Sequence, residues 1–313
     1  LDQGFKFRPP VQPPAEETGD ESPKPRNPEK FQPSDIVIIS LPHAVPRTLL
    51  GEILHRTTKA KAVAIDMMLA DRARELSDIE REMPVYKKLL REWQVEDEAF
   101  AQAIRYNGEV ILGQWPEEEW DGEGRNARRR IVWQKPPPVL WDSAKYHASF
   151  RVEPDIQDAK VRTLRPFQTV FDGQKNERTP ALGVAVAAAW QGISPEKLAQ
   201  TRVTRDEMQL GNRRVPLHNG LLLVNYLSDR SYFSGQGNNN YVYDLALDLF
   251  LPDETGFENK IVFIGETSFK SKDIFTTPLG DMPGVHIHAH TVITLLGEQG
   301  APRFVSTQLA AAL

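Results

Sequence analysis

The chain has 313 residues, of which 40% are hydrophobic and 26% charged, a composition typical of a folded globular protein. Its net charge of −5 disfavours nucleic acid as a partner, and the absence of cysteine excludes disulfides, thiolate metal sites and cysteine nucleophiles. There is no uninterrupted apolar run of roughly 18 residues, so we expect no membrane-spanning helix inside the chain.

Residues 1–34 differ in composition from the rest of the chain. They hold eight of the 24 prolines together with many charged residues. Such a segment has too few apolar side chains to build a core. We therefore predict a proline-rich linker or an extended arm.

A strand, a helix and a second strand follow this segment. DIVIISL (35–41) is a β-branched run that predicts a buried strand, and KAVAIDMML (61–69) predicts another. Between them, the apolar residues of 46–60 have helical spacing. Two strands joined through a helix are expected to lie parallel, with a right-handed crossover.

The next stretch extends the sheet and then interrupts it. Residues 95–108 predict a helix with an acidic first turn that ends at Asn-Gly, and 109–115 predict the third strand. Residues 116–146 collect acidic residues, arginines, aromatics and a proline triplet. We expect them to form an exposed loop or hairpin inserted into the body of the domain.

The second half of the chain continues the same alternation. We expect, in chain order, antiparallel strands in 147–172, an Ala-rich helix at 179–194, a buried strand at 220–228, a loop and short helix in 231–250, a strand at 258–267 and a helix at 284–300. The predicted fold class is α/β. It is a single domain over 35–305 with a mostly parallel central sheet flanked by helices, plus antiparallel additions and long surface insertions.

The stretch 260–297 resembles the closing signature of the CHASE domains of the second type. These are extracytoplasmic sensory domains of membrane-bound cyclases, histidine kinases and serine/threonine kinases. The residues that carry the resemblance are Lys260–Gly265, Asp273, Thr277-Pro278, Pro283-Gly284-Val285 and His288-Ala289. Weaker matches in the same order are the DIVIIS strand, Pro46-Arg47, Asp66, Asp97 and Asn225-Tyr226. The loop IISLPHAVPR departs from the family, because it is short and lacks acidic residues after the strand.

The resemblance implies an extracytoplasmic ligand-sensing or signal-input domain of a membrane-anchored protein, without enzymatic activity or a cofactor of its own. Membrane helices would flank the chain. Residues 306–313 would begin the second of them, although an ordinary terminal helix has the same composition. The implied ligand is a small molecule or a protein, and the implied assembly is a homodimer or a membrane complex. The alternative is a scaffold subunit that reuses the sensory fold, which the proline-rich arm and the short first loop favour.

Three aspartates are candidate ligand-binding residues: Asp66, Asp97 and Asp273. Asp66 and Asp273 follow predicted strands, and ligands of open α/β sheets bind at the carboxyl ends of the strands. Converging carboxylates could hold Mg²⁺ or Ca²⁺, and a metal-dependent hydrolase or phosphatase is a third hypothesis. The alternative is structural: Asp97 caps the helix at 98–107, and Asp273 braces the loop before Thr276.

Two further positions complete the candidate set. Thr267 follows Gly265 at the end of a buried strand, where backbone N–H groups and hydroxyls could bind an anion or form a structural turn. Asn225 is a candidate through the asparagine-tyrosine pair of the resemblance alone. No nucleophile motif such as G-x-S-x-G accompanies them.

Three histidines stand at alternate positions in MPGVHIHAH (282–290). On a strand they would share one face and suit zinc. The Pro-Gly pair before them favours a helix, which leaves His286 and His290 on one face and turns His288 away. That pair would need a third ligand such as Asp273 or Asp281 to hold a metal. We interpret His288 as a packing or loop-anchoring residue.

Overall fold

The computed structural model describes residues 30–41, 45–69, 77–121, 128–171, 176–227, 242–244, 254–268, 273–298 and 300–301. Most of the predicted proline-rich arm, most of the loop and helix predicted in 231–250, and the predicted terminal helix at 306–313 lie outside these residues. None of the described helices is both long and apolar enough to cross a membrane.

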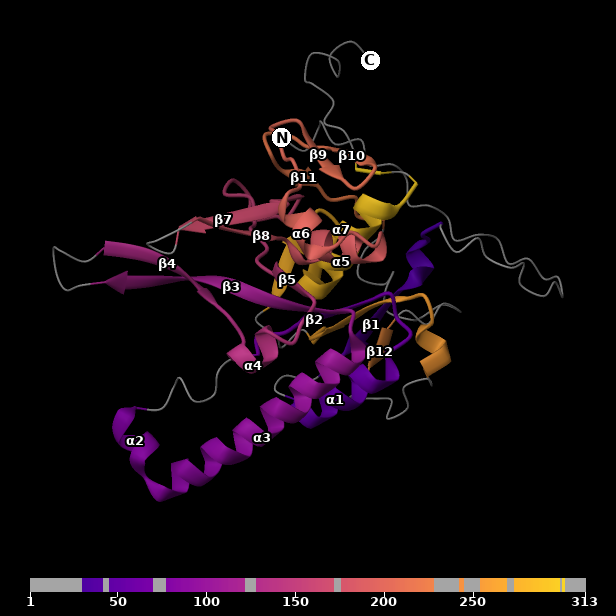
Figure 1. Ribbon diagram of the computed structural model, residues 1–313. Coiled ribbons are helices and arrows are strands. Elements are labelled where there is room, and N and C mark those ends of the chain that lie inside the picture. Colours follow the sequence, from indigo (N-terminus) through magenta and orange to yellow (C-terminus); the bar gives the residue numbers. More distant parts are fainter. Residues whose placement is uncertain are drawn as a thin grey trace, which may run out of the picture.

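A central sheet of seven strands organises the domain (Figure 1). Its order is β12 (Val242–Asp244), β1 (Ile36–Ser40), β13 (Ile261–Gly265), β2 (Ala62–Asp66) and β3 (Val110–Asp121), with both β4 (Arg128–Gln134) and β5 (Tyr146–Ser149) paired to β3. All pairs are parallel except β3 with β4. The mostly parallel sheet is thus confirmed. Strand β13, late in the sequence, inserts between the first two strands.

Helices cover both faces of the sheet (Figure 1). One face packs on α5 (Leu182–Trp190) and α7 (Gly284–Leu296), and the other on α1 (Arg47–Arg56), α3 (Pro84–Asn107) and α4 (Pro138–Trp141). Successive side chains of a strand point to opposite faces. Ile36 and Ile38 of β1 accordingly join the α5/α7 core, whereas Val37 and Ile39 join the α1/α3 core.

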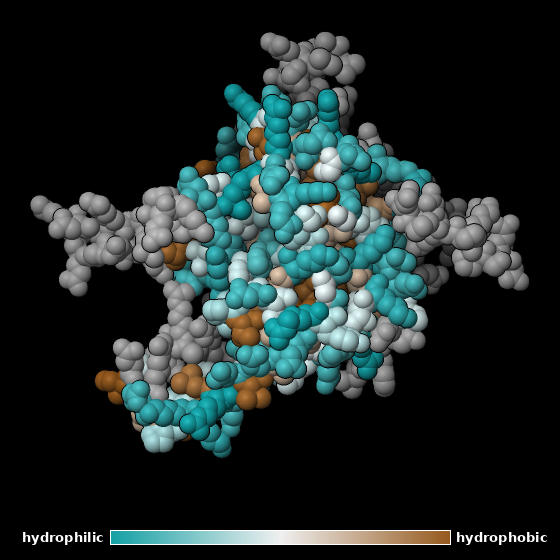
Figure 2. Space-filling model, in the orientation of Figure 1, coloured by the Kyte–Doolittle hydropathy of each residue, from teal (hydrophilic) through white to brown (hydrophobic). Residues whose placement is uncertain are grey.

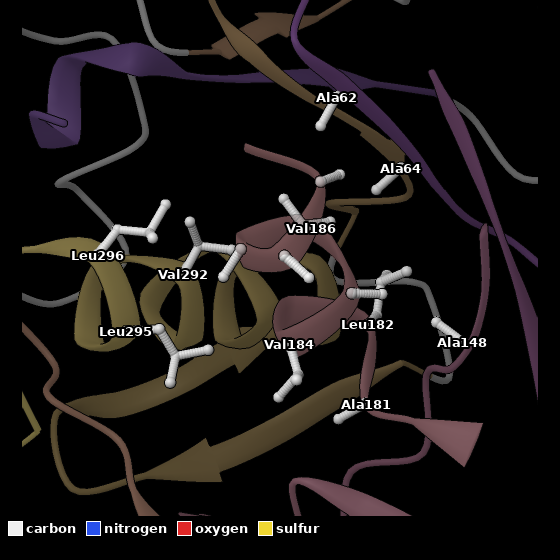
Figure 3. Packing of buried hydrophobic residues seen from close by; sticks show 14 of the residues in the cluster. Ala62, Ala64, Ala148, Ala181, Leu182, Val184, Val186, Val292, Leu295 and Leu296 are labelled. Atoms are coloured by element: carbon white, nitrogen blue, oxygen red, sulfur yellow. The ribbon is translucent and has the colours of Figure 1, made fainter. Parts of the chain in front are cut away.

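Helices α5 and α7 lie against each other within one buried cluster (Figure 3), and they approach each other closely at Gly183 of α5. A Cβ atom placed on Gly183 would lie 2.7 Å from Cβ of Thr291 and 2.9 Å from the carbonyl oxygen of His288. Alanines on α5 and on the strands keep this layer thin. The Ala-rich helix predicted from the sequence is therefore confirmed as a packing element.

Small antiparallel pairs surround the sheet. They are β6 (Thr163–Leu164) with β11 (Leu222–Leu223), β7 (Phe167–Phe171) with β8 (Asn176–Pro180), β9 (Glu207–Leu210) with β10 (Arg213–Pro216), and β14 (Ile274–Thr277) with β15 (Gly280–Pro283). The two remaining helices are short: α2 (Asp78–Glu82) lies at the outer end of α3, and α6 (Pro195–Ala199) follows α5. The predicted antiparallel additions are confirmed at 167–171, whereas β5 is a parallel strand of the central sheet.

Several predicted elements differ from the observed ones. The buried strand predicted at 220–228 is found but is much shorter, because the chain pairs over only two residues, with β6 outside the central sheet, and then packs along α7. The helix predicted at 95–108 starts at Pro84, whose missing N–H suits a first helical turn. Strand β3 runs on to Asp121 and makes the insertion a hairpin with β4. Within 231–250, residues 242–244 form an edge strand and no helix.

Candidate functional site

A row of small and polar residues crosses the carboxyl edge of the sheet. Ser40, Gly265 and Asp66 stand in register on β1, β13 and β2, at the last position of each strand. Their place in the strand alternation puts them on the face that packs on α5 and α7. We call these three residues the edge row.

Two glycines let neighbouring groups close over the edge row. A Cβ atom on Gly265 would lie 3.1 Å from Cγ2 of Val285, the second residue of α7. A Cβ atom on Gly113 of β3 would lie 1.9 Å from the ring of Phe150. The helix start and the aromatic ring can approach the sheet this closely only because both side chains are absent. Val285 and the ring of Phe150 therefore lie directly against this edge of the sheet.

Asp66 is the central charged group of the site. Its side chain is 5% exposed, and its Oδ2 atom has no hydrogen-bond partner among the residues that the structure describes. Burial raises the pKa of Asp66 well above its usual range, and the negative charge of Asp273 raises it further. Asp66 consequently holds its proton more tightly than an exposed aspartate does.

Asp273 lies against the start of α7. Its carbonyl oxygen accepts a 3.0 Å hydrogen bond from the N–H of Gly284, and its carboxylate would be 2.4 Å from a Cβ atom on that glycine. Burial raises the pKa of Asp273 to about 7, the charge of Glu266 adds to the effect, and the Gly284 backbone opposes it. Asp273 therefore changes its charge near neutral pH, directly beside a helix terminus.

His288 connects α7 to the edge row. Its Nε2 atom lies 3.3 Å from the carbonyl oxygen of Phe150 and 3.9 Å from Oδ1 of Asp66. Burial lowers the pKa of His288 to about 4, so the ring is neutral and donates to the carbonyl. Because the ring is neutral, its approach to Asp66 is not a salt bridge between two charged groups. The loop-anchoring role predicted for His288 is confirmed.

Thr267 lies next to the edge row, as its sequence position suggested. Its hydroxyl oxygen is 2.6 Å from that of Ser40, and both residues are buried. This hydrogen bond ties the end of β1 to the chain that leaves β13. Thr267, Asp66 and Asp273 are thus the predicted site residues that the fold brings to one edge.

Asp97 occupies a different place. It lies inside α3 and forms an ion pair with Arg47 at the start of α1, with both side chains largely buried. The capping role predicted for Asp97 is wrong, because α3 begins thirteen residues earlier, at Pro84. Its observed contact joins two helices on the opposite face of the sheet from α7.

Asn225 lies at the far end of α7. Its backbone N–H donates a 2.9 Å hydrogen bond to Oγ1 of Thr294. Thr294 is ten residues after Gly284, which corresponds to roughly 15 Å along a helix. Asn225 is therefore separated from the edge row by most of the length of α7.

The histidine triplet is helical, as the Pro-Gly pair predicted. His286, His288 and His290 are all buried in α7. His290 packs edge-on against the ring of Tyr226 at 5.3 Å, and burial lowers its pKa to about 3. Over the described part of the chain, no group of three or more His, Cys, Asp or Glu side chains is arranged to hold a metal ion. The predicted zinc pair of His286 and His290 thus has no third ligand there.

Three participants were missed in the sequence: Ser40, Gly113 and Phe150. Ser40 ends a buried strand, where a polar residue is a signal, but its position beside Gly265 depends on the insertion of β13. Gly113 stands inside a strand, where a glycine often marks a close approach. Phe150 carries no local signal, since its role comes from its ring over Gly113 and its carbonyl opposite His288.

The comparison with protein families covers nearly the whole chain, since residues 33–312 match the CHASE2 domain. The chain belongs to the CHASE2 family. CHASE2 domains are a sensory family of signalling proteins and are generally extracellular or periplasmic. Neither the curated proteins nor the solved structures include a match to this CHASE2 domain.

The CHASE2 signature residues gather around the edge row. Strand β13 ends in Gly265, Asp273 meets Gly284 at the start of α7, and His288 faces Asp66 one turn later. The signature therefore describes one structural unit: a strand end, a buried acid and the helix that closes over them. A motif spread over about 30 residues of sequence is compact in space.

Proposed function

We propose that this CHASE2 domain is the extracytoplasmic, ligand-sensing input of a membrane-anchored signalling protein and performs no catalysis itself. Family membership supports the sensory role. The observation that carries the ligand site is the buried Oδ2 atom of Asp66, which lacks a hydrogen-bond partner among the described residues at the carboxyl edge. Buried polar atoms are nearly always paired, so such an atom indicates a binding position.

The chemistry of the edge row favours a small ligand that donates hydrogen bonds or carries positive charge. Two acids, Asp66 and Asp273, lie close together, and burial raises the pKa of both. An amine or a hydroxyl compound would supply the missing donor, and a cation would favour the ionised acids. Because a cation competes with protons, its affinity should rise as the pH increases through about 7.

Helix α7 offers a route for the signal. It starts at the edge row and ends at the opposite edge of the sheet, where Glu298 lies 2.6 Å from Lys30. Lys30 precedes β1 and Glu298 follows α7, so the residues that enter β1 and those that leave α7 lie side by side. A ligand that binds two positions of α7 unequally would change how these segments sit, and we propose that they lead to the membrane.

A thermal-shift panel tests the ligand site. The panel holds small amines, amino acids and polyols, and it is applied to the wild-type chain, to Asp66→Asn and to Asp206→Asn, whose aspartate is exposed. We expect at least one compound that stabilises the wild type and Asp206→Asn but not Asp66→Asn. Compounds that stabilise all three equally, or none of them, would argue against a site at the edge row.

Because the chain has no cysteine, a single introduced thiol can report on which side of the membrane the domain lies. Ile156 is fully exposed, so Ile156→Cys introduces the only thiol of the chain at an accessible position. In intact cells that express the complete protein, a membrane-impermeant maleimide should label this variant. Labelling only after lysis would contradict an extracytoplasmic domain. Native mass spectrometry from membranes that shows a stoichiometric partner of another sequence would favour the scaffold alternative.

A further inference from the structure

Helices α2 and α3 form an arm that projects from the body of the domain (Figure 1). Only the last part of α3 enters the core, through residues between Phe100 and Asn107. None of the residues between 77 and 99 whose side chains are described is buried. We call residues 78–95 the arm. Its α3 part, from Pro84 to Val95, leaves the body of the domain as a single helix. A helix of roughly 12–15 residues is only marginally stable by itself in water, so contact with a partner would stabilise this part.

The arm carries large apolar side chains in solvent. Ile79 is 80% exposed, Met83 45%, Val85 65% and Val95 69%. Figure 2 shows hydrophobic residues gathered along this projection. Single exposed apolar residues are ordinary, but several on one projecting element mark a contact surface.

The arm also continues the apolar stripe of the packed half of α3. Leu89 and Trp93 are half-buried and lie eleven and seven residues before Phe100, respectively, at helical spacing on the same side. The stripe therefore runs past the body of the domain toward the tip at Val85. A partner helix laid along the arm would meet a continuous apolar face.

We infer that the arm is a docking surface for a second copy of this chain, with the two arms packed antiparallel. The charges along the arm are self-complementary in that arrangement. Three acids, Asp78, Glu80 and Glu82, outweigh the single Arg81 at the tip. Lys87, Lys88 and Arg91 lie one to three turns farther along. In an antiparallel pair, the acidic tip of each copy lies beside the basic turn of the other.

The ion pairs within one arm leave these charges available for exchange. Lys87 lies 2.7 Å from Glu82 and Lys88 lies 3.8 Å from Glu92, but all four side chains are at least half exposed. Exposed pairs contribute little, typically about 0–1 kcal/mol, so partner contacts can replace them. The arm also carries four acidic and four basic residues over 78–95, so it has no net positive charge that would attract an anionic lipid surface.

Sedimentation velocity of the 313-residue chain over a range of concentrations tests the inference. We expect a concentration-dependent dimer whose dissociation constant rises at least about tenfold in Val85→Glu. Ile156→Glu is the matched control, because it places the same charge at an exposed apolar position far from the arm in sequence, and it should dimerise like the wild type. Circular dichroism of each variant confirms that the fold is retained.

Two double variants with reversed charges test whether the arms pack antiparallel. Glu80→Lys/Glu82→Lys and Lys87→Glu/Lys88→Glu should each be mainly monomeric, whereas an equimolar mixture should form heterodimers. A wild-type chain that remains monomeric at every concentration would overturn the inference, as would a Val85→Glu dimer of unchanged affinity. Binding of the chain to phosphatidylcholine/phosphatidylglycerol vesicles that Val85→Glu abolishes would instead assign the arm to a lipid surface. These outcomes do not depend on the proposed ligand site, since none of the variants touches the edge row.

Discussion

Helices α7 and α3 are the same kind of element in opposite surroundings. All 13 residues of α7 are buried, including three histidines and two threonines. Only five of the 24 residues of α3 are buried, and its outer half exposes valines to solvent. In α7 polar side chains are buried in the core, whereas in α3 apolar side chains face the solvent.

The difference indicates two separate roles. Enclosing ionisable groups shifts their pKa values, as for His288 and for Asp66 opposite it, and makes that region responsive to charge. Leaving apolar side chains in solvent makes the arm of α3 responsive to a partner. On this account the ligand acts at α7 and assembly occurs at α3, on opposite faces of one sheet.

The packed part of α3 and the tip of the arm should respond very differently to the loss of one ion-pair partner. Asp97→Ala leaves Arg47 buried without its ion-pair carboxylate and should cost roughly 3–5 kcal/mol of unfolding free energy. Glu82→Ala removes an exposed pair with Lys87 and should cost about 1 kcal/mol or less. Urea unfolding of both variants provides the measurement. Equal losses would mean that the arm is as well packed as the rest of the helix.

The pH dependence of stability should separate the two kinds of buried group around α7. The pKa of Asp273 is raised to about 7, so its contribution to stability is present below about pH 4 and is lost as the pH rises to 7. The pKa values of His288 and His290 are lowered, so their contributions are lost in the opposite direction, as the pH falls from about 6.5 to 4.

Because these contributions change in opposite directions, the unfolding free energy of the wild type should vary little with pH. A substitution that removes one of them should make the other visible. Asp273→Asn removes a contribution to the unfolding free energy that decreases as the pH rises. Its stability relative to the wild type should increase by up to about 4 kcal/mol between pH 4 and pH 7. The exposed Asp206→Asn variant serves as the control and should keep a constant difference from the wild type. Denaturant unfolding at several pH values tests this, and a constant difference for Asp273→Asn would contradict the assignment.

A pair of glycine substitutions compares the two faces of the sheet. Gly183→Ala pushes a methyl group to 2.7 Å from Thr291 between α5 and α7 and should destabilise the fold by about 1–3 kcal/mol. Gly51→Ala in α1 places its methyl 3.6 Å from Ala103, an ordinary contact, and should stabilise by up to about 1 kcal/mol. Thermal unfolding would show the opposite signs, and the same sign in both would disprove the close α5–α7 crossing.

The smallest effect is expected at the tip of the arm. Val85 is 65% exposed, so Val85→Glu should change the unfolding free energy of the monomer by only about 0.5 kcal/mol or less. Unfolding at a concentration below the dimer dissociation constant measures it. A large loss there would mean that the side chain is packed within one chain and is not available to a second copy.

Much of the sheet could be predicted because its strands are short β-branched runs. The strands around Ile36–Ser40, Ala62–Asp66 and Ile261–Gly265 follow from composition alone. The run at 220–228 misled because Leu222 and Val224 are buried without joining the sheet. Hydrophobicity reports burial, and it does not distinguish a sheet position from a segment packed on a helix.

The site could be predicted less completely, because it depends on the order of the strands. Asp66 and Asp273 were expected at carboxyl strand ends, and the fold brings them together. No local pattern indicates that β13 lies between β1 and β2, and this insertion is what sets Gly265 between Ser40 and Asp66. The contact of His288 with Asp66 has the same origin.

Hydrogen exchange along α7 tests most directly the claim that the edge row is coupled to the far end of the domain. The wild type and Asp273→Asn are compared at pH 6 and pH 8, after correction for intrinsic exchange rates, with α1 as the internal reference. The account predicts that protection in Gly284–Leu296 differs between the two pH values in the wild type, that the difference disappears in Asp273→Asn, and that Arg47–Arg56 is unchanged in both. Protection in α7 that is independent of pH, or a change of equal size in α1, would contradict it.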